Sequence, residues 1–330
     1  MMKIVQYITL PLLLIPALVQ AEVSDSALFD ISGTQVAEVK KAADLIASGA
    51  DVNARDAAGN TPLMIASAHV ARNGYADEIW RELLNIYVAA GADLQARNNA
   101  GLNAAELCAY AWGPFNANVA QELMSRGVEM RPVYRLLYAC RTGNAAAVTA
   151  ALAAGADADV HHALPLKLSM EPGTLSRPNQ DAVVAALLEG GANPNADAPA
   201  VLHCAVHSRR AQTLASLFAH GLDLSHCSSS DIADALGYLW LQEEEFPKLC
   251  FDILIRNGAD VNAYRQQPGK VVREPLLHLA VRYQGAAEVS RLLELGADPT
   301  LTDEHGRTSL ALARELKRYD LIPLLETAEN

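Results

Sequence analysis

Eight glycines recur along the chain, each at a point where a helix is predicted to end. Two residues after every one of them stands Asp, Glu or Asn, and a mostly aliphatic pair such as Leu45-Ile46 lies four and three residues before it. The glycines, spaced 28 to 42 residues apart, are Gly49, Gly91, Gly127, Gly155, Gly191, Gly221, Gly258 and Gly296. Glycine readily adopts the left-handed conformation that follows a helix end. A pattern with this period predicts a chain built from repeated supersecondary units.

The second part of the pattern is a helix start that follows the glycine. After Gly49, Thr61 can cap a helix whose first residue is Pro62. This segment, Thr61-Pro-Leu-Met-Ile-Ala66, returns near the end of the chain as Thr308-Ser-Leu-Ala-Leu-Ala313. Both resemble the start of an ankyrin repeat, whose hallmark is Thr-Pro-Leu-His-x-Ala on a period of about 33 residues. The resemblance covers roughly residues 27–328, and it implies an all-α ankyrin-repeat solenoid of inner helices, outer helices and hairpin fingers.

The register of glycines and helix starts predicts about nine helix pairs. Residues 27–48 form an N-terminal cap pair and residues 308–328 a C-terminal cap pair, whose Lys317 and Arg318 supply the polar face that a terminal repeat needs. The pairs between them start at or near Thr61, Asn103, Tyr134, Leu164-Pro165, Ala200, Asp231 and Pro275.

The fingers between the pairs differ in length. They are shortened in the middle repeats, after Gly127, Gly155 and Gly191, whereas the finger over 258–275 is longer and contains the turn signal Gln266-Gln267-Pro268-Gly269. No linker interrupts the array. We therefore expect a single ankyrin-repeat domain over residues 22–330.

Residues 1–21 have the pattern of a secretory signal peptide. A basic Lys3 precedes an apolar run over residues 8–19, and Val19-Gln20-Ala21 fits a small-residue cleavage site. The run is short for a membrane span and contains two prolines, although an uncleaved anchor is the alternative. Arg outnumbers Lys and alanine is abundant, as in a GC-rich bacterial genome. We expect cleavage after Ala21, export to the periplasm and no stable membrane insertion afterwards.

The charge of the chain argues against anionic partners. The leader holds one of the 26 basic residues and none of the 38 acidic ones, so the remaining chain has a formal charge of −13. Its Lys and Arg residues form no cluster longer than two. Nucleic acid is therefore excluded as a partner, and a basic protein partner is compatible.

Five cysteines are present, and their odd number leaves at least one thiol even if disulfides form after export. Cys108, Cys140 and Cys204 fall on inner helices, where a small buried hydrophobe is expected. No Cys-x-x-Cys occurs, so the sequence indicates neither a zinc site nor a redox pair.

His203 and His207 lie one helical turn apart, the spacing with which two imidazoles bind zinc in metalloproteases. The intervening residues contain no Glu that could act as base. His203 and His278 also occupy the fourth position of the Thr-Pro-Leu-His motif. In the ankyrin family that His hydrogen-bonds the backbone of the neighbouring finger, which implies a structural role. We found no nucleophile, phosphate-binding or catalytic motif, and we expect no enzyme activity, no metal and no cofactor.

The family resemblance implies that partners bind in the concave groove, at the end of each inner helix. The residues in these slots that can anchor a partner are His69, Tyr110, Trp112, Arg141, His207, Tyr238, Arg282 and Tyr283. Tyr, Trp and Arg dominate the energetics of protein–protein interfaces. The alternative is that some, above all Trp112 and Tyr238, pack as core.

The sequence thus predicts a periplasmic, non-catalytic and monomeric protein that binds another protein. Some exported bacterial ankyrin proteins resemble inhibitors or immunity proteins that neutralise a toxin or hydrolase in the same compartment. Others are accessory proteins in oxidative-stress defence beside a catalase. A metal-binding protein that uses His203 and His207 is a further alternative.

Overall fold

The computed structural model describes residues 27–30, 39–73, 77–110, 116–170, 179–208, 210–240, 245–267 and 270–329. The predicted leader, residues 1–21, lies outside them. The described residues divide into two units, one that ends at Thr142 and one that begins at Gly143. The expectation of a single domain stays a prediction.

The first unit is helical, with its helices in two stacked series. After a helical turn at residues 27–30, the helices are α2 (Val39–Ala47), α3 (Pro62–Asn73), α4 (Asp77–Ala89), α5 (Ala104–Tyr110), α6 (Asn116–Ser125) and α7 (Pro132–Thr142). The first helix of each pair packs on the first helix of the next, α3 on α5 and α5 on α7, while α2, α4 and α6 form the second series. This alternation is the layering expected of repeated helix pairs.

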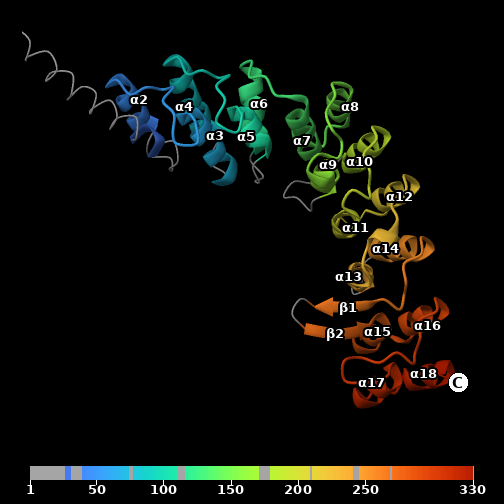
Figure 1. The fold of residues 1–330 in the computed structure, drawn as a ribbon. Helices are drawn as coiled ribbons and strands as arrows, with labels where there is room; N and C mark the ends of the chain where they lie inside the picture. Colours follow the sequence, from blue (N-terminus) through green and yellow to red (C-terminus); the bar gives the residue numbers. More distant parts are fainter. Residues whose placement is uncertain are drawn as a thin grey trace, which may run out of the picture. The chain divides into compact units, whose positions relative to one another are not determined.

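Within itself, the second unit shows the same kind of alternation. Its elements are α8 (Ala145–Ala153), α9 (Val160–Met170), α10 (Gln180–Glu189), α11 (Ala198–His207), α12 (Ala211–Ala219), the 3₁₀-helix η2 (Leu224–His226), α13 (Ser229–Trp240), α14 (Glu245–Arg256), β1 (Tyr264–Gln267), β2 (Lys270–Pro275), α15 (Leu276–Tyr283), α16 (Ala286–Glu294), α17 (Ser309–Glu315) and α18 (Ile322–Glu329). Helices α9, α11, α13, α15 and α17 pack successively on one another (Figure 1). Helices α8, α10, α12 and α14 form the second series, and α16 packs on α18.

The finger that the sequence predicts to be longest contains a β-hairpin. Strands β1 and β2 pair antiparallel with Tyr264 opposite Pro275 and Arg265 opposite Glu274, and a bulge lies between Arg265 and Gln267. β1 also packs against α13. Two residues of the predicted turn, Pro268 and Gly269, lie outside the described residues.

All eight periodic glycines have positive φ angles, between 85° and 104°. At the first of them the amide of Gly49 donates to Ile46 O, and the amide of Ala50 donates to Leu45 O at 3.1 Å. These bonds satisfy carbonyls that the end of α2 would otherwise leave open. The predicted role of the glycines as helix terminators is confirmed.

Amide side chains connect one finger to the next. Asn53, four residues after its glycine, donates from Nδ2 to Gly91 O at 3.0 Å and accepts the Asp93 amide at Oδ1 at 2.7 Å. The same two bonds link Gln95 to Gly127 and Glu129, Asn195 to Gly221 and Asp223, and Asn262 to Gly296 and Asp298. Four fingers therefore hold the helix end of the next repeat in this way, an interaction between repeats that our sequence analysis did not identify.

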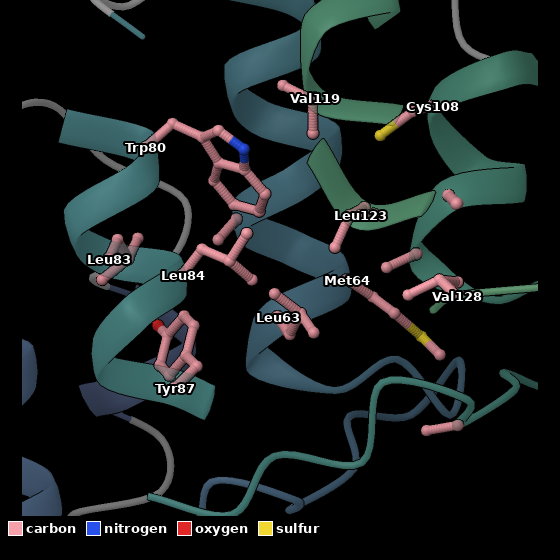
Figure 2. Close-up of a cluster of buried hydrophobic side chains, with 14 of the residues drawn as sticks. Leu63, Met64, Trp80, Leu83, Leu84, Tyr87, Cys108, Val119, Leu123 and Val128 are labelled. Carbon is pink, nitrogen blue, oxygen red and sulfur yellow. The ribbon is translucent and has the colours of Figure 1, made fainter. Parts of the chain in front are cut away.

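The core of the first unit lies between the two helix series. Leu63 of α3, Trp80 and Leu84 of α4, and Leu123 of α6 are buried together (Figure 2). Ala104 and Ala105 of α5 are also buried, and their small side chains let neighbouring helices approach closely. Among the residues that the structure describes, no helix combines the length and apolar character required to cross a membrane.

A buried carboxylate ties α5 to the start of α7. Glu106 has no exposed side-chain surface, and it accepts from Arg131 Nε at 2.9 Å and from Arg97 Nη1 at 2.7 Å. The backbone amide of Glu106 donates to Asn103 Oδ1, so that Asn103 caps α5. The backbone amide of Arg131 donates to Glu106 Oε1. Burial alone would raise the pKa of Glu106, but these hydrogen bonds outweigh burial and lower it.

Candidate functional site

The eight predicted groove residues are divided between the two units. In the first unit, His69 lies in α3, Tyr110 ends α5 and Arg141 lies half-buried in the last turn of α7, whereas Trp112 lies outside the described residues. In the second unit, His207 ends α11, Tyr238 lies in α13, and Arg282 and Tyr283 end α15. These last four lie on three first helices that pack successively, and we call them the strip.

Two members of the strip are in direct contact. The rings of His207 and Tyr238 stack with centroids 4.1 Å apart and planes inclined by 28°. Both side chains are half-buried, so Tyr238 contributes to the packing of α11 on α13 and also presents surface. Packing in the core and exposure in the groove, the two alternatives for Tyr238, therefore do not exclude each other.

The stack continues to His203. Its ring centroid lies 4.0 Å from that of His207. Nδ1 of His207 lies 2.8 Å from His203 O, and because a carbonyl only accepts, this nitrogen carries the proton in that hydrogen bond. Partial burial and the neighbouring His207 lower the pKa of His203, although Asp234 opposes the shift. The neutral form of His203 is thus favoured near pH 7.

The β-hairpin holds Arg282 in place. Its Nε donates to Glu274 Oε1 of β2 at 3.1 Å. Tyr283, the next residue, is 64% exposed. The strip thus combines an oriented guanidinium, a stacked imidazole–phenol pair and an exposed aromatic ring. The sequence signal for the Arg282–Glu274 contact was weak, because register alone does not show where a hairpin side chain lies.

The two histidines of the Thr-Pro-Leu-His motif behave differently. His278 is fully buried, and its Nε2 lies 2.8 Å from Arg307 O, the bond to the neighbouring finger that the family resemblance implies. Burial lowers the pKa of His278. The side chain of His203 is instead exposed and contacts the ring of His207. The expectation that His203 hydrogen-bonds the neighbouring finger is therefore wrong. The finger between Gly221 and Ser229 is shorter than that between Gly296 and Ser309, which removes the segment that His203 would reach.

No metal centre is assembled in the described part of the chain. Within it, no group of three or more His, Cys, Asp or Glu side chains is arranged to hold a metal ion. His203 and His207 are therefore a pair that lacks a third ligand from the described residues.

The cysteines are all thiols in the structure. Cys108 and Cys140 are buried as predicted, but Cys204 is only half-buried. Burial raises the pKa of Cys108 to about 12. A thiol with so high a pKa is a poor nucleophile at neutral pH, so Cys108 is suited to packing.

The sequence matches no protein-family model, and a search of curated proteins also finds no match.

Proposed function

We propose that this chain is a non-catalytic protein-binding module of the ankyrin-repeat class that is exported to the periplasm. The repeat pattern supports the class: eight glycines of positive φ end helices, and amide side chains link successive fingers. The pattern of residues 1–21 supports export.

The strip is the observation that carries the binding function. It places His207, Tyr238, Arg282 and Tyr283 on consecutive first helices, α11, α13 and α15. Aromatic rings that are already oriented lose little conformational entropy when a partner covers them. An exposed Tyr beside an oriented Arg has the composition of an interface hot spot.

The charge of the chain narrows the class of partner. A formal charge of −13 after removal of the leader favours association with a basic protein. We infer that the partner is a basic toxin or hydrolase acting in the periplasm, which the chain would neutralise by binding. The alternative function is an accessory role beside a catalase. That function would use the same binding surface with a different protein partner.

The test is affinity capture from periplasmic extract with matched variants. Replacing two aromatic anchors, Tyr238→Ala with Tyr283→Ala, should weaken capture of the main partner at least about thirtyfold, because losing one anchor typically costs about 2 kcal/mol. Tyr319→Ala is the control, since Tyr319 is 71% exposed but lies outside the strip.

Equal capture by the strip variant and the wild type would refute the binding site. Loss of capture in the Tyr319→Ala control alone would place the interface at the C-terminal end. A basic hydrolase or toxin as the captured protein supports inhibition, and a catalase would support the rival role. Circular dichroism checks that all variants are folded.

A further inference from the structure

A cleft of about 400 Å³ opens in the second unit. Its lining comes from the end of α13, from α14, from Gln284 after α15 and from the first turns of α16. A volume of this size is sufficient for a small molecule. None of the four strip residues lines the cleft, although Leu239 and Gln284 of its lining directly follow Tyr238 and Tyr283.

The apolar side of the cleft is aromatic. Trp240 and Phe251 have ring centroids 4.8 Å apart and planes inclined by 51°. Trp240 is only 8% exposed, yet its indole N–H has no hydrogen-bond acceptor within the described structure. A buried donor without an acceptor is uncommon and unfavourable. A ligand oxygen bound here would remove that penalty.

The polar side of the cleft carries two opposite charges. Lys248 lies on α14 and Glu288 on α16, and neither forms an ion pair with any residue that the structure describes. The third charged group, Arg291, is already paired with Asp252 of α14. The cleft therefore offers one cation and one anion from separate helices, with an aromatic surface beside them.

We propose that this cleft binds a small zwitterion with an aromatic body, that is, a free aromatic α-amino acid. Its carboxylate pairs with the Lys248 ammonium and accepts the Trp240 indole N–H. Its ammonium group pairs with the Glu288 carboxylate, and its ring packs on Trp240 and Phe251. A ligand of this class satisfies the unpartnered donor and both charges at once, which an apolar molecule or a simple anion does not.

The ligand side of the test uses L-phenylalanine and three analogues, measured by calorimetry with the full chain. Phenylalaninamide lacks the carboxylate, 3-phenylpropanoate lacks the ammonium group and glycine lacks the ring. We expect saturable binding of phenylalanine with a dissociation constant below about 1 mM, and at least tenfold weaker binding of each analogue. No saturation by phenylalanine up to about 10 mM overturns the proposal.

The protein side uses variants that each remove one contact. Lys248→Gln should abolish the preference for phenylalanine over phenylalaninamide, and Glu288→Gln the preference over 3-phenylpropanoate. Trp240→Phe keeps an aromatic ring but removes the N–H, and should weaken phenylalanine several-fold. Lys40→Gln, an exposed lysine of α2, is the control and should leave every affinity unchanged.

The result separates the zwitterion from related ligands. If 3-phenylpropanoate binds wild type as tightly as phenylalanine, the cleft recognises a monocarboxylate and the proposal is wrong. If both charge variants retain wild-type preferences, the phenylalanine is bound elsewhere and the assignment of the cleft is wrong. Neither result would bear on the proposal that the strip binds a protein partner, because capture of that partner is measured with different variants.

Discussion

Replacing Glu106 with Gln is expected to destabilise the junction between α5 and α7. The substitution preserves the shape of the side chain but removes the charge that faces Arg97 and Arg131. Glu106 accepts from Arg97 Nη1 at 2.7 Å and from Arg131 Nε at 2.9 Å, and the Gln side chain would instead point an N–H donor at one of these donors. Breaking a buried ion pair from one side typically costs about 3–5 kcal/mol.

The exposure of the two arginines decides where in that range the loss falls. Their side chains are 40% and 46% exposed, so each charge can return to water when its partner is gone. We therefore expect about 3 kcal/mol, the lower end of the range. In a chain of repeats this loss is local. Hydrogen exchange should show about a hundredfold faster opening of the amides in α5 and at the start of α7.

The matched control is Glu315→Gln. Glu315 pairs with Arg307 at 2.7 Å but is 55% exposed, so its loss should cost at most about 1 kcal/mol. The pH dependence gives a second check. Since the folded pKa of Glu106 is lowered, its contribution is present above the unfolded pKa and is lost as the pH falls through the folded pKa. A change below about 0.5 kcal/mol in Glu106→Gln at pH 7 would refute the reasoning, because the network would then contribute no more than a surface pair.

Three further predictions concern the last finger, the thiols and the leader. Burial would raise the pKa of Asp303, but hydrogen bonds from Arg307 and the His305 amide outweigh burial and lower it to about 2. Protection of the α17 amides from hydrogen exchange should therefore be constant above about pH 4 and decline toward pH 2. Protection that does not change over this range would contradict the prediction. Thiol titration of the unfolded, unreduced chain should find five free thiols. In the native chain, Cys108 should react with the thiol reagent far more slowly than in the unfolded chain. A count of one or three thiols would reveal disulfides, and Cys108–Cys140 would be the first pairing to examine. Mass spectrometry of periplasmic protein should find Glu22 as the first residue, whereas intact Met1 in the membrane fraction would favour an anchored form.

Helix starts and ends were predictable because their signals are local. Thr308 caps α17 by accepting the Ala311 amide, and Asn103 caps α5 in the same way, so the sequence places both starts within one residue. The glycines required only the conformational preference of a single residue. The start of α9 was less clear, since His161, His162 and Ala163 adopt positive φ angles and the regular helix follows them, near the predicted Leu164.

Side-chain partners across repeats were harder to predict. The exposure of His203 depends on the length of the finger between Gly221 and Ser229, which is separated from His203 by helix α12. The contact of Arg282 with Glu274 depends on the register of the hairpin. The ion pair of Arg291 with Asp252 depends on how closely α16 approaches α14. These contacts join residues from different elements, so no periodic pattern in the sequence reports them. A search for amide residues four positions after each glycine would have found the links between fingers.

Site-specific photo-crosslinking tests the central claim, that the strip contacts a protein partner. A photo-reactive phenylalanine derivative placed at Tyr283, which is 64% exposed, should form a crosslinked species with one periplasmic protein on irradiation. The same group at Tyr319, which is 71% exposed outside the strip, should not. A crosslink from position 319 with none from position 283 would contradict the assignment of the strip as the binding surface.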